Sequence, residues 1–136
     1  NHWAKLETGN GYGSTNTRVR NFTTTSSSGS ACTPAVNATL GATITINATG
    51  LYLIEYGEAN PTVTGVMSIT LNSTQLNLAP TITSQIASRD ITTGNIVHSL
   101  SRSIRLVNGD VLRAQASVTT ITGTTGCYFT CEQLRT

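Results

Sequence analysis

Charged side chains are scarce in this 136-residue chain, where they make up 10% of the positions, as eight Lys and Arg against six Asp and Glu. Long surface helices need Glu, Lys, Ala and Leu on their solvent faces, and the chain has one Lys and four Glu. This scarcity excludes a helical bundle and a parallel sheet covered by helices. The seven Arg are scattered, with no two adjacent. A nucleic-acid partner, which needs a dense basic stripe, is therefore not expected.

Long apolar runs are missing as well, and so are the short motifs that mark common cofactor sites. The longest unbroken apolar stretch covers residues 51–54, whereas a membrane-spanning helix needs about 20 apolar residues. No phosphate-binding loop, dinucleotide-binding glycine motif or H-E-x-x-H pair occurs in the chain. We therefore expect no membrane insertion, no cofactor and no metal, in a chain whose length fits one compact domain.

Cysteine is also rare, with only Cys32, Cys127 and Cys131. The last two stand four residues apart, which spans about 13 Å along a strand, and a disulfide needs Cα atoms within about 7 Å. Either Cys32 forms a disulfide with Cys127 or Cys131, or all three thiols are free. Zinc is not expected, because this spacing with two remote histidines makes a poor ligand set.

Threonine, serine and glycine are abundant instead, and they occupy 51 of the 136 positions. Between them, β-branched and aromatic residues alternate with polar ones, which is typical of half-buried strands. The alternation predicts strands over residues 42–46, 51–56, 66–71, 75–78, 82–87, 96–106, 111–118 and 127–134, and no long helix. So many short strands, separated by turn formers, predict an all-β antiparallel sandwich or jelly roll.

The first forty residues are less regular than the rest. Residues 3–6 predict a strand at the edge of a sheet, and residues 18–22 predict another. Three polar segments predict surface loops, namely the Thr/Ser/Gly run over residues 23–30 and the segments 88–95 and 119–126.

Four segments occur in an order that resembles the TNF-like jelly roll, a family that includes the globular heads of complement-type proteins. They are ATGLYLIEYGEA, VMSITLNSTQL, SRSIRLVNGDVLRAQASV and GCYFTCEQL. The family has a G-x-Y-aromatic strand, a strand that ends in Asn, a leucine-rich strand that runs into Gly-Asp, and an apolar final strand. The matching positions here are Gly50, Tyr52, Leu71, Asn72, Leu106, Gly109 and Asp110.

The opening of the chain, WAKL and then TRVRNF, is more similar to microbial relatives of this family. These relatives are trimeric heads at the tips of phage tail fibres and of bacterial surface fibres, including the mosaic adhesive trimer type. The resemblance implies an extracellular homotrimer, on a cell-surface fibre or a virion tail fibre, that binds a glycan or receptor. We accordingly expect one head domain over residues 1–136, with irregular strands and loops leading from the shaft in residues 1–40 and a jelly-roll core in residues 41–136.

The segment from Leu51 to Tyr56 is apolar on both faces, and a strand of that kind is covered on both sides. In a two-layer sandwich one of these faces needs a further cover, which three copies around an axis would supply. Loops or the first forty residues of a monomer could also supply it. The residues expected at the trimer interface are Leu51, Leu53, Tyr56, His98 and Arg102. Arg102 is included because a buried arginine needs a partner, such as a carboxylate of a neighbouring protomer.

Carbohydrate sites combine aromatic platforms with amide, carboxylate or arginine groups on loops. The candidate ligand-binding residues are Tyr12, Arg18, Asn60, Arg89, Asp90 and Asn95. Tyr12 is expected to be exposed in a flexible Gly/Asn-rich loop. Four N-x-S/T sequons also occur, at Asn21, Asn37, Asn47 and Asn72, and they matter only on a glycosylating secretory route.

Catalytic groups are few, and no enzymatic function is expected. His98 has no neighbouring nucleophile motif, and Glu55 and Glu58 would point to opposite faces of one strand. The sequence therefore predicts a non-enzymatic adhesin or receptor-binding head that recognises a cell-surface ligand, most simply a glycan. One alternative is a domain that only trimerises and registers a fibre. A polysaccharide hydrolase is a third reading.

Overall fold

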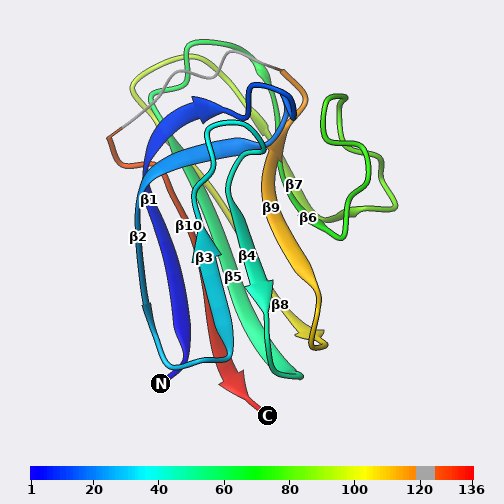
Figure 1. Cartoon of the computed structure of the whole chain (residues 1–136). Coiled ribbons are helices and arrows are strands. Elements are labelled where there is room, and N and C mark those ends of the chain that lie inside the picture. Colours follow the sequence, from blue (N-terminus) through cyan, green and yellow to red (C-terminus); the bar gives the residue numbers. More distant parts are fainter. Residues whose placement is uncertain (119–124) are drawn as a thin grey trace.

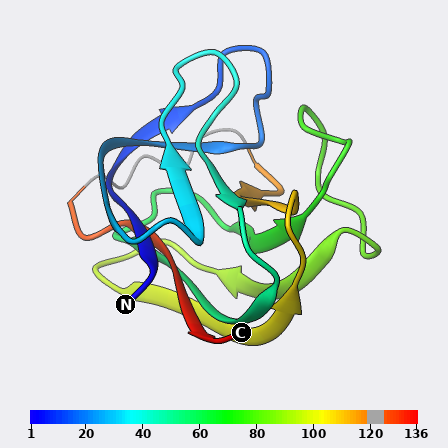
Figure 2. The ribbon, with the colours of Figure 1, turned by 60° about the horizontal axis from the view of Figure 1, so that its bottom comes forward.

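The structure is a computed structural model that describes residues 1–118 and 125–136, so most of the predicted loop over residues 119–126 lies outside the described residues. Ten strands form two antiparallel five-stranded sheets stacked face to face, as Figures 1 and 2 show. The strands are β1 (Trp3–Tyr12), β2 (Arg20–Ser28), β3 (Cys32–Ala35), β4 (Thr43–Ile46), β5 (Gly50–Ala59), β6 (Gly65–Leu71), β7 (Gln85–Ile91), β8 (Val97–Leu106), β9 (Val111–Ala116) and β10 (Tyr128–Arg135). No helix occurs in the described residues, and none therefore that could span a membrane.

Each sheet mixes strands that are distant in sequence. Sheet A has the order β2-β1-β10-β5-β8, and sheet B has the order β3-β4-β9-β6-β7. Both chain ends lie at one end of the sandwich, and the loops that follow β5 and β7 lie at the other (Figure 1). This arrangement is the predicted all-β antiparallel sandwich.

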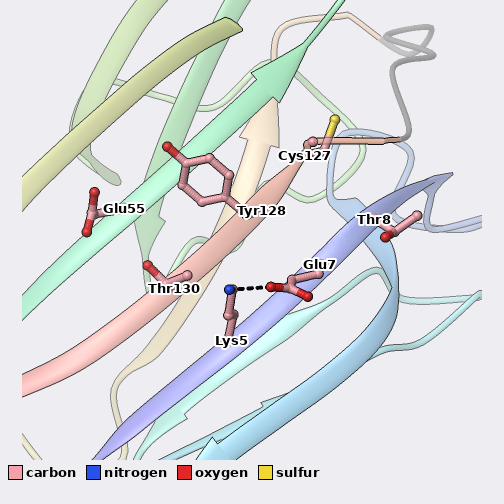
Figure 3. Close-up of a pocket in the computed structure, with 8 residues that line it drawn as sticks. Lys5, Glu7, Thr8, Glu55, Cys127, Tyr128 and Thr130 are labelled. Carbon is pink, nitrogen blue, oxygen red and sulfur yellow. Dashed lines mark ion pairs between the residues drawn. The ribbon is translucent and has the colours of Figure 1, made fainter.

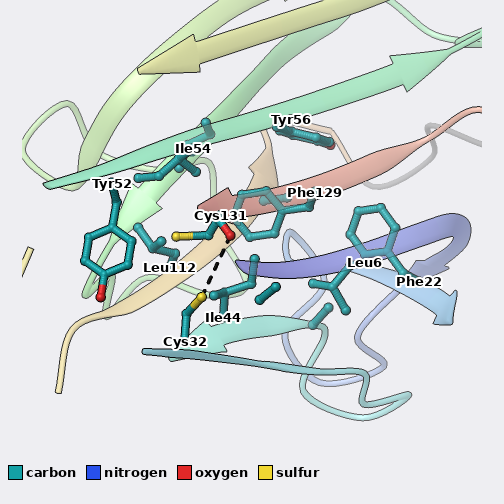
Figure 4. Close-up of a cluster of buried hydrophobic side chains, with 14 of the residues drawn as sticks. Leu6, Phe22, Cys32, Ile44, Tyr52, Ile54, Tyr56, Leu112, Phe129 and Cys131 are labelled. Carbon is teal, nitrogen blue, oxygen red and sulfur yellow. Dashed lines mark hydrogen bonds between the residues drawn. The ribbon is translucent and has the colours of Figure 1, made fainter. Parts of the chain in front are cut away.

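The core lies between the two sheets and follows the alternation of the sequence. Tyr52, Ile54 and Tyr56 of β5 are all buried, as predicted for one face of that strand. The ring of Tyr56 meets Phe129 of β10 edge to face, with 6.0 Å between ring centroids. Ile44 of β4 faces them from sheet B (Figure 4). Burial of such side chains stabilises the fold by about 1.5–3 kcal/mol each.

The first forty residues differ from the prediction, because they supply three regular strands to the two sheets. β1 is not an edge strand, since it pairs with both β2 and β10. The Thr/Ser run over residues 23–28 is part of β2, which is the edge of sheet A and is exposed along this run. β3 was not predicted at all. A threonine-rich edge strand can form without alternating apolar residues, because backbone pairing on one side and β-branched side chains are enough to stabilise the strand.

The segment around β7 also differs from the prediction. Residues 75–78 do not form a strand but belong to the loop 72–84, which projects from sheet B beside β6 and β7 in Figure 1. Its Gln75 carbonyl accepts a hydrogen bond from the buried Gln115 amide at 3.1 Å. β7 then begins at Gln85 and continues to Ile91, so half of the predicted loop over residues 88–95 is strand.

Candidate functional site

The outer face of sheet A carries half-buried apolar side chains on β5 and on β1, the two strands that flank β10. Leu51 and Leu53 of β5 point outwards, opposite to the core face of the same strand. The register places Leu53 beside Glu132 of β10, and Glu132 beside Trp3 of β1. Trp3, Leu51 and Leu53 are each only partly exposed in the isolated chain. The predicted two-sided apolar strand therefore exists, and the first forty residues do not cover its outer side.

A hollow of about 500 Å³ lies on this face, over β1, β10 and β5 (Figure 3). Lys5 and Glu7 form an ion pair at one side, and Glu55 and Tyr128 lie at the other. The Tyr128 ring lies over Gly57, where a Cβ atom would come within 2.3 Å of it. A glycine at this position is therefore needed for the aromatic ring to lie flat against β5.

Glutamates are concentrated on the same face. Glu7, Glu55 and Glu132 are three of the four glutamates of the chain, and register places all three on the outer side of sheet A. Glu58, the fourth, is buried. Glu55 and Glu58 thus have opposite environments, as predicted, and do not form a pair of carboxylates that face each other.

Two of the predicted interface residues are wrong, because the chain itself buries them. Tyr56 is 0% exposed and His98 is 6% exposed in the single chain. The Nε2 atom of His98 lies 3.3 Å from the carbonyl oxygen of Thr92. Both side chains occupy inward positions, so neither can contact a neighbouring protomer through the sheet face.

The buried cluster around Tyr56 contains an ion pair that was not predicted. Arg20 of β2 donates to both oxygens of Glu58, at 2.6 Å and 3.2 Å, and both side chains are 0% exposed. The Tyr56 hydroxyl and the Cys127 thiol also donate to Glu58, at 2.6 Å and 3.1 Å. Every oxygen of the carboxylate is therefore engaged, which is what a buried charge requires.

The ion pair controls the protonation of its neighbours. Burial alone would lower the pKa of Arg20, but the hydrogen bonds and charge of Glu58 outweigh it and raise that pKa. Burial, followed by the charge of Glu58, raises the pKa of the Tyr56 hydroxyl well above its usual value. The same two causes raise the pKa of Cys127. Arg20 thus stays charged while Tyr56 and Cys127 stay neutral donors to the Glu58 carboxylate.

Tyr12 belongs to this cluster and not to an exposed loop. It is the last residue of β1, it is half-buried, and the Arg20 guanidinium lies 5.4 Å from the centroid of its ring. Such a cation–π contact stabilises the pair by about 0.5–2 kcal/mol. The predicted role of Tyr12 as an exposed binding-loop residue is therefore wrong.

The other predicted ligand residues lie in different parts of the surface. Asn60 and Asn95 come from neighbouring loops, because Asn60 N–H donates to the Ile96 carbonyl at 2.8 Å. Asp90 lies on strand β7 and is exposed. Arg18 is half-buried, and its backbone N–H donates to Leu76 in the loop 72–84. The fold thus brings Asn60 and Asn95 together but does not gather the six residues into one site.

Arg89 and Arg102 connect the open edges of the two sheets. Arg89 of β7 donates to the Ser99 carbonyl of β8 at 2.9 Å, and Arg102 of β8 donates to the Ile86 carbonyl of β7 at 2.6 Å. The two contacts are reciprocal, because each arginine donates to a backbone carbonyl on the facing edge strand. Arg102 therefore has its partner within the chain, and the expected need for a carboxylate of another protomer does not arise.

The three cysteines are all free and buried. Cys32 of β3 lies across the core from Cys131 of β10, with its sulfur 3.8 Å from the Cys131 carbonyl oxygen (Figure 4). The Cys131 thiol forms a hydrogen bond with Cys32 that lowers the pKa of Cys32 and raises that of Cys131. Cys127 lies instead against Glu58. If Cys32 forms a disulfide, Cys131 is the cysteine placed for it.

In the part of the chain that the structure describes, no group of three or more His, Cys, Asp or Glu side chains is placed to hold a metal ion. The contacts of His98 are with the backbone of Thr92 and not with a nucleophile or a carboxylate.

Solved structures with a similar fold are found at low sequence identity. The chain aligns with murine APRIL at pH 8.5 with a TM-score of 0.71 and 10% identity, over 98% of both chains. It aligns with pika GITRL with a TM-score of 0.63 and 14% identity, over 100% of this chain and 99% of the other. The alignment with bushbaby GITRL has a TM-score of 0.60 and 14% identity, and it covers 98% of this chain and 94% of the other. No protein-family model and no curated protein sequence matches the chain.

These similarities confirm the TNF-like jelly roll, and at 10–14% identity they establish the fold alone. The three structures are APRIL and GITRL and not microbial fibre heads, so they give no support to the fibre-tip type.

Proposed function

We propose that the chain is an extracellular, homotrimeric, non-enzymatic head that binds a cell-surface ligand. The observation that carries the proposal is the outer face of sheet A, where Leu51 and Leu53 of β5, and Trp3 of β1 on the other side of β10, are apolar and only partly covered. Two further copies around a threefold axis would bury this face, and the TNF-like resemblance implies such a trimer. Tyr128, which lies flat over Gly57 on the same face, adds aromatic contact area of the kind enriched in interfaces.

The charges on this face fit a symmetric contact. If three copies met at this face, the carboxylates of Glu7, Glu55 and Glu132 would repel those of the neighbouring copies. Lys5, beside Glu7 in the middle of the face, supplies a positive charge that offsets this repulsion. Arg105 of β8 and Arg135 of β10 lie at its end, on either side of Leu51. Pairs of opposite charge across the protomers would then give register to the trimer, with the apolar residues supplying most of the buried area.

The outer side of sheet B is the candidate ligand-binding surface. With sheet A turned to the axis, the outer side of sheet B and the loop 72–84 remain accessible. That loop carries Leu78 and Ile82, which are 57% and 87% exposed. Exposed aliphatic side chains among Thr, Asn and Gln favour contact with another molecule. We propose a surface glycan as the ligand and the tip of a fibre as the location, while a domain that only registers a fibre is the alternative.

The test compares the wild type with a variant that cannot trimerise. Leu53→Glu adds a carboxylate beside Glu132 on the face that the three copies share. Val107→Glu makes the same kind of change at an exposed position in the turn between β8 and β9, outside both sheet faces. The proteins are applied to a glycan array and to cells. We expect binding by the wild type and by Val107→Glu, and at least about a hundredfold weaker binding by Leu53→Glu because multivalency is lost. A trimer that binds no glycan and no cell surface would instead support the registration domain.

A further inference from the structure

A second pocket, of about 410 Å³, lies on the outer side of sheet B, away from the face that the trimer would bury. Its sides are the turn over residues 35–41, between β3 and β4, and Leu76 of the loop 72–84. Thr43 and Arg113 line it from the sheet, where the register of β4 and β9 places them side by side. The volume is in the range of small-ligand sites, which is about 300–1,000 Å³.

Hydrogen bonds hold the walls of this pocket in place. The Asn37 side-chain oxygen accepts from the N–H groups of Thr39 and Leu40, at 2.9 Å and 2.8 Å. The Asn16 amide donates to the Leu40 carbonyl at 3.0 Å. On the other side, the Leu76 carbonyl accepts from the Arg18 N–H at 3.2 Å. The pocket is thus formed before any ligand enters, which lowers the cost of binding.

Arg113 gives the pocket an uncompensated positive charge. Its side chain is half-buried, and its guanidinium has a long hydrogen bond, 3.4 Å, to the Ser73 carbonyl. Neither of the two ion pairs that the described residues form includes it. Burial without a carboxylate lowers the pKa of Arg113. A cation that is partly removed from water and lacks an acidic partner in its own chain is a favourable site for an anion.

The remaining lining combines donors with aliphatic surface. The Asn37 oxygen is used by its turn, so its amide N–H groups remain for a ligand, and the Thr43 hydroxyl lies nearby. Val36 and Leu40, 40% and 51% exposed, provide an apolar wall. The pocket therefore fits a compact ligand that has a negative charge, several hydroxyl groups and one less polar side.

We propose that this pocket binds a carboxylate-bearing sugar, such as a sialic or a uronic acid, with its carboxylate on Arg113. Ring hydroxyls or an N-acetyl group contact Asn37 and Thr43, and the less polar side of the sugar lies against Val36 and Leu40. The inference rests on the proposed function, because it names the class of surface ligand that the head recognises. A guanidinium binds a carboxylate through two parallel hydrogen bonds, so an arginine suits this role better than a lysine.

Binding is measured by titration calorimetry and by saturation-transfer NMR, with 3′-sialyllactose and a glucuronic-acid disaccharide as acidic probes and lactose as the neutral control. The protein is made in bacteria, so that the Asn37 sequon beside the pocket carries no glycan. We expect one acidic probe to bind at least about tenfold more tightly than lactose. Arg113→Gln should weaken that binding by about tenfold or more. Arg105→Gln, the same change on sheet A, should leave it unchanged.

Leu40 offers a second pair of variants that do not disturb a buried group. Leu40→Glu puts a carboxylate at the mouth of the pocket and should abolish binding of the acidic sugar, whereas Leu40→Lys should preserve or strengthen it. If neither acidic probe binds, or if binding is the same in Arg113→Gln and in the wild type, the inference is wrong. Failure of the proposed function looks different: sugar binding would then persist in a protein that is monomeric or does not attach to cells.

Discussion

The buried ion pair between Arg20 and Glu58 joins β2 to β5, which β1 and β10 separate in sheet A, and its removal should destabilise the protein strongly. In Arg20→Met, Glu58 loses two charge-assisted hydrogen bonds, of 2.6 Å and 3.2 Å, and keeps only the neutral donors Tyr56 and Cys127. A buried charge that loses its partner costs about 3–5 kcal/mol. That is a large share of the 5–15 kcal/mol by which small domains are typically stable.

A double-mutant cycle measures this coupling. Arg20→Met, Glu58→Gln and the double variant are unfolded in urea and followed by far-UV circular dichroism, at one protomer concentration because trimer formation would affect the midpoint. Each single change should lower the free energy of unfolding by about 3–5 kcal/mol. The double variant should cost about 2–3 kcal/mol less than the sum, since it leaves no unpaired charge.

Lys5→Met, made in the Leu53→Glu background so that no trimer covers sheet A, is the matched control, because it removes an ion pair on the surface of the single chain. The side chains of Lys5 and Glu7 are 42% and 46% exposed, and such exposed pairs contribute about 0–1 kcal/mol. The structural role assigned to Arg20 and Glu58 is refuted if their variants lower the free energy of unfolding no more than this control does. It is also refuted if the loss in the double variant equals the sum of the losses in the two single variants.

Three further predictions concern the edges, the thiols and the tyrosines. Arg89→Ala and Arg102→Ala should each lower the free energy of unfolding by about 0.5–1.5 kcal/mol. Both variants should also speed amide hydrogen exchange along β7 and β8, and unchanged exchange would contradict the reciprocal contacts. Treatment with oxidised glutathione during refolding should join Cys32 to Cys131 and leave one thiol for alkylation, whereas three reactive thiols after unfolding would exclude the disulfide. Burial raises the pKa of Tyr52 to about 12, so the folded state favours the neutral hydroxyl. The free energy of unfolding should therefore fall as the pH rises from about 10 to 12. A free energy of unfolding that stays constant up to pH 12 would contradict the burial of Tyr52.

The alternation of apolar residues was enough to predict most of the two sheets. It located β4, β5, β6, β8, β9 and β10 within a few residues, because each of these strands buries one side in the core. It did not find β3, and it read residues 23–28 of the edge strand β2 as a loop. Residues 24–28 of β2 are exposed and pair with β1 through their backbone. A strand of this kind has no alternation of apolar residues by which the sequence could predict it.

The candidate site was harder to predict, because its contacts join residues that are distant in sequence. Arg20 and Glu58 are 38 residues apart, and nothing in the local sequence indicates that they meet. Arg89 and Arg102 were assigned to a ligand and to an interface, but both donate to carbonyls of the facing edge strand. The outward position of Leu53 was easier to predict, because a strand that is apolar on both faces can be recognised from its local sequence. Its place at a trimer interface stays a prediction.

The central claim is that the outer face of sheet A is an interface between copies of this chain. The most direct test is the molar mass of the wild type, measured by light scattering or sedimentation at low micromolar concentration. The account predicts about three times the 14.3 kDa of one chain, and a return to the single-chain mass in Leu53→Glu but not in Val107→Glu. A wild type that is monomeric under these conditions would contradict the claim.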